Sequence, residues 1–111
     1  METKHTTGPW VIDWNVSRLD IFGADETTLV ASLRRSPLSQ AIDEAARSNA
    51  RLIAAAPELY DALRELLTDM VIAQGNMRKA AKRDPAWEGC AEIIQPRIDA
   101  ARAAIAKAEG K

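Results

Sequence analysis

The stretch Asn49-Ala50-Arg51-Leu52-Ile53-Ala54-Ala55-Ala56-Pro57-Glu58-Leu59-Tyr60-Asp61-Ala62-Leu63 decides how this chain is built. It joins two amphipathic helices through one proline, which removes a backbone donor and clashes with the preceding turn. A proline can also serve as the first residue of the helix that follows it. We therefore predict one helix over about residues 39–55 and a second over residues 57–82.

The residues before this stretch show the two-residue period that is typical of strands. Trp10, Ile12 and Trp14 alternate with their neighbours, and the same alternation returns in 18–22 and 28–34. Because the connections between these segments are short, the three strands must pair antiparallel, as a meander. One face of such a sheet is apolar and needs a cover.

The first helix carries an apolar face that contains one polar residue, Asn49. The face consists of Ile42, Ala45, Asn49, Leu52, Ile53 and Ala56. An amide on an apolar face must be satisfied by backbone, water or a partner chain. We expect a hydrogen bond from Asn49 to the meander, and ligand binding is the alternative.

The later helices carry apolar residues at an alternating spacing of four and three. In the second helix these are Leu59, Leu63, Leu66, Met70, Ala73 and Met77, and in the third they are Trp87, Ala91, Ile94, Ile98, Ala101, Ile105 and Ala108. Asp84 and Pro85 suit the N-cap and the first position of the third helix. Two matching apolar faces joined by a short connection predict an antiparallel hairpin. Pro96 predicts a kink or a missing hydrogen bond within the third helix.

The sequence therefore predicts one α+β domain over residues 1–111. It comprises a flexible N-terminus (1–8), a three-stranded antiparallel meander (9–35) and a helical part (39–109) of three helices, the last two forming a long hairpin. A second apolar edge of the hairpin, formed by Tyr60, Leu67, Val71 and Ile93, predicts a homo-oligomer that associates through the helices.

Composition narrows the partners and the location. The net charge of −1 provides no field for a nucleic acid polymer. No apolar run approaches the roughly 20 residues that span a membrane. The single cysteine and the polar start, which lacks the apolar core of a signal peptide, predict a cytoplasmic protein.

The sequence offers no catalytic, metal or cofactor site. His5 has no partners at ligand spacing, and Cys90 has only that distant histidine as a base. Two of the carboxylates Asp13, Asp20, Asp25 and Glu26 can meet across a hairpin, as acid and base pairs do, but solvated positions explain them equally well. We expect that the protein is not an enzyme.

Arginine and lysine are the residues that can recognise an anion. The cluster Arg78, Lys79, Lys82 and Arg83 either complements the negative end of the second helix or contacts a phosphate. Isolated arginines among alanines suit bidentate phosphate recognition, although solvated helix faces explain them too. They are Arg47, Arg51, Arg64, Arg97 and Arg102.

Three segments carry a resemblance to small phage and prophage proteins. They are Thr6-Thr7-Gly8-Pro9-Trp10, Asn49–Leu59 and Ala101-Arg102-Ala103-Ala104-Ile105-Ala106-Lys107-Ala108. Within that group, the order of an antiparallel sheet, an Asn-Ala helix and long C-terminal helices is similar to the Thoeris anti-defence sponge proteins. Those phage proteins bind cyclic ADP-ribose-type signals or cyclic oligonucleotides without degrading them. The resemblance implies an oligomer with ligand pockets between subunits.

The resemblance implies a phage-encoded counter-defence protein that sequesters a nucleotide second messenger in the cytoplasm of an infected bacterium. In such a pocket we expect phosphate contacts from Arg51, Arg97 and Arg102, stacking of a base on Trp87 or Tyr60, and a base or ribose hydrogen bond from Asn49. The alternative is an inhibitor or accessory factor that binds a host defence protein, as anti-CRISPR proteins do.

Overall fold

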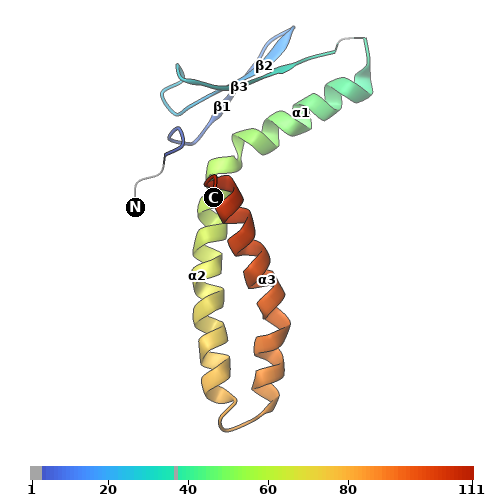
Figure 1. Cartoon of the computed structure of the whole chain (residues 1–111). Coiled ribbons are helices and arrows are strands. Elements are labelled where there is room, and N and C mark those ends of the chain that lie inside the picture. The colour runs from blue at the N-terminus through green and yellow to red at the C-terminus, as the bar shows by residue number, and fades with distance from the viewer. Residues whose placement is uncertain (1–3, 37) are drawn as a thin grey trace. The chain divides into compact units, whose positions relative to one another are not determined.

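The computed structural model describes residues 4–36 and 38–111. Residues 1–3 of the predicted flexible N-terminus lie outside the described residues, as does Pro37 between the predicted meander and first helix. The elements follow in the order β1 (Val11–Trp14), β2 (Arg18–Phe22), β3 (Leu29–Arg34), α1 (Gln40–Ala54), α2 (Ala56–Ala80) and α3 (Ala86–Ala108) (Figure 1). This confirms the predicted α+β fold, a three-stranded antiparallel sheet followed by three helices of which the last two pack together.

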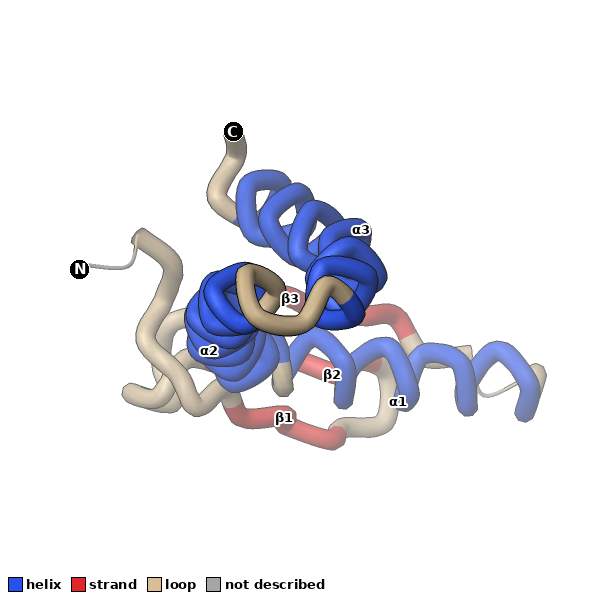
Figure 2. The backbone as a smooth tube through the Cα atoms, turned by 90° about the horizontal axis from the view of Figure 1, so that it is seen from below, coloured by secondary structure: helices blue, strands red, loops and turns tan. Residues whose placement is uncertain are grey.

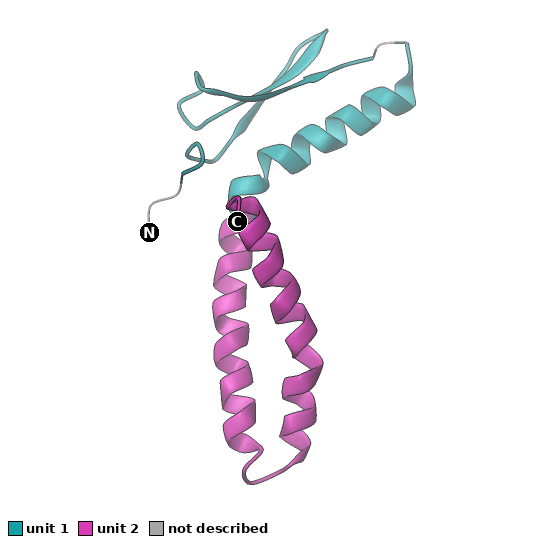
Figure 3. Ribbon diagram, viewed as in Figure 1, with its two compact units in different colours: residues 1–59 teal, residues 60–111 magenta. Residues whose placement is uncertain are grey.

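The chain divides into two compact units, residues 1–59 and 60–111 (Figure 3). The first contains the sheet, α1 and the first turn of α2, and the second contains the rest of α2, from Tyr60 on, together with α3.

The sheet of the first unit has the strand order β1-β2-β3, and both pairs are antiparallel. Ile21 lies opposite Ile12 on one side and opposite Ala31 on the other. Leu19 is flanked in the same way by Trp14 and Leu33. Residues opposite one another share a face, so these two rows form the apolar face of the sheet.

Helix α1 covers this face and contacts all three strands (Figure 2). Its contribution to the core consists of small residues. Ala46 and Ala50 are buried against Leu19 and Ile21, and Ile53 and Ala54 pack at the margin. Because the side chain of alanine is small, the backbone of α1 can approach the strands closely.

The predicted apolar face of α1 is therefore not the face that meets the sheet. The adjacent face, which carries Ala46 and Ala50, meets it instead. Ile42 and Leu52 are 59% and 64% exposed, and Asn49 is exposed as well. Asn49 was expected to hydrogen-bond to the meander, but it lies on the exposed side of the helix, because the side that carries Ala46 and Ala50 meets the sheet instead. Of the six predicted residues, only Ile53 and Ala56 are partly buried.

The N-terminal segment packs against the rest of the first unit through hydrogen bonds and one close contact. The Thr7 carbonyl accepts a hydrogen bond from Ala24 N at 3.1 Å, and the Trp10 indole donates to the Thr6 carbonyl at 2.9 Å. Gly8 lies so near the buried Pro57 that a Cβ on Gly8 would lie 2.8 Å from the Cβ of Pro57. Two of the segments that carried the phage resemblance are thus in direct contact.

Arg35 connects the end of the sheet to α1. Its guanidinium donates to both carboxylate oxygens of Asp43, at 2.9 and 3.1 Å, and to the Asn15 carbonyl at 2.9 Å. Arg47 donates to the same carboxylate at 3.1 Å. The hydrogen bonds from Arg35 are the main reason that the pKa of Asp43 lies below its usual value.

The second unit is the hairpin of α2 and α3. In α3 the predicted spacing is correct for Ala91 and Ile98, which are buried, and for Ile94, Ala101 and Ile105, which are partly buried. Trp87 and Ala108, at the two ends of the predicted face, are exposed instead. The prediction for α2 is correct for Leu63, Met70, Ala73 and Met77. Leu59 and Leu66 are exposed instead.

A buried glutamine takes part in the hairpin contact. Gln74 donates to the Ala91 carbonyl at 3.0 Å and to Gln95 Oε1 at 2.7 Å, and Gln95 in turn donates to Asp99 at 2.9 Å. A buried amide is tolerated only when it is hydrogen-bonded, so these contacts favour one register of the two helices. Helix α3 runs through Pro96 without ending there.

Alanine substitutions at Gly8 and Gly75 should have opposite effects on stability, because an added methyl group meets a close neighbour at Gly8 and open space at Gly75. Gly8→Ala should lower the free energy of unfolding by about 1–3 kcal/mol, because neither the proline ring nor the backbone can move away without strain. Gly75→Ala should raise it by about 0.5–1 kcal/mol, because Gly75 lies inside α2 with nothing within 4 Å of the added methyl. Urea denaturation of both variants measures this. A neutral Gly8→Ala variant would contradict the contact.

The bonds between Arg35 and Asp43 predict an acid-dependent stability. Folding lowers the pKa of Asp43. The contribution of its carboxylate to stability is therefore fully present above the pKa in the unfolded chain, about 4, and is lost as the pH falls through the lower pKa in the folded protein. Wild type should therefore exceed Asp43→Asn in its urea midpoint at about pH 6, and the two midpoints should converge toward about pH 2. A difference that stays constant over this range would rule out the ionised carboxylate as its cause.

Candidate functional site

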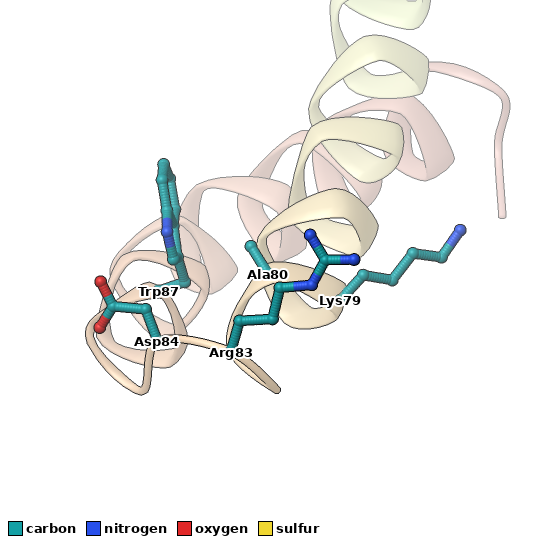
Figure 4. Close-up of a pocket in the computed structure, with 5 residues that line it drawn as sticks. All are labelled: Lys79, Ala80, Arg83, Asp84 and Trp87. Atoms are coloured by element: carbon teal, nitrogen blue, oxygen red, sulfur yellow. The ribbon is translucent and has the colours of Figure 1, made fainter.

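The hairpin has a hollow at its tip, where α2 ends and α3 begins (Figure 4). Its volume is about 470 Å³. Two cations, a carboxylate, an aromatic ring and a methyl group line it, from Lys79, Ala80, Arg83, Asp84 and Trp87. The hollow lies entirely within the second unit.

The local sequence explains this geometry. Helix α2 ends at Ala80, and Arg83 N and Asp84 N both donate to the Ala80 carbonyl at 3.0 Å, which closes a tight turn. Asp84 then accepts from Ala86 N at 3.1 Å. The predicted N-cap at Asp84 is therefore one residue too early, because α3 begins at Ala86 and its N-cap residue is Pro85, which makes no side-chain capping bond. The turn brings Arg83 and Trp87 to the same end of the hairpin.

The side chains around the hollow differ in their directions. Figure 4 shows Ala80 between the Trp87 ring and the Arg83 side chain, whereas Lys79 points away from Trp87. Trp87 is 44% exposed, so part of its ring can be covered by a bound group. The Asp84 carboxylate reduces the positive charge and offers an acceptor to hydroxyl or amino groups.

The rest of the basic cluster lies near the same helix end. Arg78 and Lys82 are exposed, and Arg78 donates to Gln95 Oε1 at 3.4 Å. Cations at this position complement the negative end of α2, and they also raise the local concentration of anions. The two alternatives that the sequence left open for this cluster, complementing the end of α2 and contacting a phosphate, are therefore compatible with each other.

The predicted ligand residues are spread over both units. Trp87 lines the hollow, and Arg97 and Arg102 are exposed on α3. Asn49 and Arg51 belong to residues 1–59. Arg51 stacks over Trp14, with its guanidinium carbon 5.4 Å from the ring centroid.

Tyr60 lies at the other end of the hairpin from Trp87. Its hydroxyl donates to Glu109 at 2.6 Å, and Arg64 lies over its ring at 5.5 Å. The bond to Glu109 is the main cause that raises the pKa of Tyr60 and lowers that of Glu109. About 20 helical residues separate Tyr60 from the tip, a distance of about 30 Å. Tyr60 and Trp87 of one hairpin therefore do not bind the same base.

The sequence interpretation did not assign Lys79, Ala80, Arg83 and Asp84 to the ligand. The signal was present, since the basic cluster had phosphate contact as one of its two explanations. The missing information was the turn, which brings Trp87 close to that cluster.

Other groups with chemical potential lie elsewhere. Asp13 and Asp20 are directly opposite each other on β1 and β2. Cys90 is exposed, and the ring of His5 meets that of Trp10 edge to face. Within 4–36 and 38–111, no three His, Cys, Asp or Glu residues are grouped so that they could hold a metal ion.

In the part of the chain that the structure describes, no helix combines the length and the apolar character that crossing a membrane requires.

The whole chain was compared with known proteins. No curated protein and no solved structure matches it. A family description does match, over residues 1–111, and it reads Salmonella phage P22 protein Y8K6. The chain therefore belongs to this phage protein family.

Proposed function

We propose that this phage protein is a non-enzymatic counter-defence protein that binds and sequesters a nucleotide second messenger of its bacterial host. The messenger is of the cyclic ADP-ribose type or a cyclic oligonucleotide, and it is held in the host cytoplasm. One observation carries the proposal: Arg83 and Trp87 line the same hollow at the hairpin tip. The family shows a phage protein, and the ligand is our inference.

The chemistry of the hollow suits a nucleotide. The Arg83 guanidinium offers a planar pair of donors for phosphate oxygens. An exposed indole offers a face on which any base can stack, a contact worth roughly 1–3 kcal/mol. Asp84 can accept from a ribose hydroxyl or an amino group. The volume of about 470 Å³ is within the range of small-molecule sites.

This proposal differs in one respect from what the resemblance to sponge proteins implies. The hollow belongs to a single hairpin, so we place the ligand at its tip and require no pocket between subunits. Lys79, which points away from Trp87, supplies general positive potential in this arrangement.

Titration calorimetry tests the proposal directly. Full-length protein is titrated with cyclic ADP-ribose isomers and with cyclic di- and trinucleotides. We expect heat with at least one of them, at least about tenfold weaker binding for Arg83→Ala and for Trp87→Ala, and weakening by added salt. The ligand should be recovered intact by mass spectrometry after heat denaturation.

Arg97→Ala and Arg102→Ala are the matched controls, because they remove exposed arginines from α3 outside the hollow. They should bind like wild type. If these variants lose binding while Arg83→Ala keeps it, the ligand lies on the α3 arginines and the hollow is not the site. A folded protein that gives no heat with any of these nucleotides refutes the sequestration proposal.

A second candidate function is inhibition of a host defence protein by direct binding. The observation that favours it is the exposure of large apolar residues on the hairpin, Leu66, Ile72 and Ile93. Such residues suit a protein surface better than a nucleotide. This function becomes the better account if the calorimetry is negative.

A further inference from the structure

Helix α1 has an exposed face without charge, which we call the α1 stripe. It consists of Ala41, Ile42, Ala45, Ser48, Asn49 and Leu52, and all six residues are exposed. Leu38, just before the helix, is 98% exposed and extends the stripe toward the sheet connection. Two of the three bulky apolar residues of α1, Ile42 and Leu52, thus lie here, whereas Ile53 packs at the margin of the core that contains Ala46 and Ala50.

The charges of α1 are kept away from the stripe. Asp43 binds Arg35 and Arg47, and Glu44 accepts a hydrogen bond from Gln40. Arg51 lies over the Trp14 ring. Single exposed leucines are ordinary, but a continuous uncharged stripe on a helix that is otherwise charged marks an interface.

The spacing of the stripe indicates the shape of its partner. Ile42, Ala45, Asn49 and Leu52 are separated by three, four and three residues, which are the a and d positions of a coiled coil. This pattern fits the side of another helix. In this register Asn49 occupies an a position, where a lone asparagine fixes the register and the number of helices.

The asparagine also indicates which helix is the partner of the stripe. A carboxamide carries both donors and an acceptor, so two identical amides that face each other satisfy one another. A two-fold axis that runs parallel to the two helices produces that arrangement, since each residue of the stripe then lies opposite its own copy. We propose that the α1 stripe pairs with the α1 stripe of a second copy of this chain, with the two Asn49 side chains facing each other. This inference does not rest on the proposed function.

The size of the contact sets its strength. Helix α1 has 15 residues and is about 22 Å long, which allows only two heptads. It is already held on the sheet, so little order is lost on pairing. An interface of this size belongs to the weak, transient class, and we expect association between about 10 µM and about 1 mM.

Sedimentation velocity of the full chain across this concentration range tests the pairing. Wild type should change from monomer to dimer. Ile42→Glu and Asn49→Lys should remain monomeric, and circular dichroism should show that both variants are folded, since both residues are exposed. Ile72→Glu is the matched control, because Ile72 is also 59% exposed but lies on α2. It should dimerise like wild type.

Cysteine cross-linking tests the register. In a Cys90→Ser background, Asn49→Cys should form a disulfide dimer on mild oxidation, because residues facing each other across the axis come within the roughly 4.4–6.8 Å between Cα atoms that a disulfide needs. Glu44→Cys, on the same helix but outside the stripe, should not. The proposal is overturned if wild type stays monomeric at the highest concentration, if Ile72→Glu dissociates the dimer as Ile42→Glu does, or if both cysteines cross-link equally.

Discussion

The first unit depends on the close contact between the alanines of α1 and strand β2. Ala46 and Ala50 pack on Leu19 and Ile21, and these four residues are the buried core of the unit. Because alanine adds little volume, the helix can approach the sheet, but the apolar area that it buries is small. Other parts of the chain must add to the core. Trp10 packs at its margin, and Gly8 lies against Pro57 where the helices meet.

The same contact explains why Ile42 and Leu52, two large residues of α1, are exposed. A helix that places its alanines against a sheet must turn Ile42 and Leu52 away from that core. The surface of α1 is therefore a consequence of how the core is built, and it is available for a partner. In the hairpin, alanine-rich packing has a different consequence. The small volume at Ala91 leaves room for the Gln74 amide, which donates to the Ala91 carbonyl and to Gln95.

The order and type of the elements could be predicted from the sequence because period and turn residues are local signals. The two-residue period of 10–14 and the proline at 57 act over a few residues, and the structure confirms both elements. The side of α1 that meets the sheet could not be predicted in this way. The helix has two apolar stripes side by side, and the choice between them is made by close packing on β2, which is not a local property. Gln74 is similar, since its burial inside the hairpin depends on two acceptors that are distant in the sequence, the Ala91 carbonyl and Gln95 Oε1, 17 and 21 residues away.

The candidate site was predictable only in parts. Trp87 was expected to stack a base, and the basic cluster had phosphate contact as an alternative, but their meeting depends on the turn through Asp84. Arg51 instead makes a cation–π contact with Trp14 within the first unit. The spacing of these two residues along the chain does not predict that contact.

One pair of variants tests most directly whether the alanine side of α1 faces the sheet. Ala50 is fully buried, whereas Leu52, two residues further, is 64% exposed. Urea denaturation at low protein concentration should show that Ala50→Leu lowers the free energy of unfolding by about 1–3 kcal/mol through overpacking. Leu52→Ala should change it by less than about 0.5 kcal/mol. A cost of about 2 kcal/mol or more for Leu52→Ala, together with a tolerated Ala50→Leu, would contradict the account and place the large residues of α1 in the core.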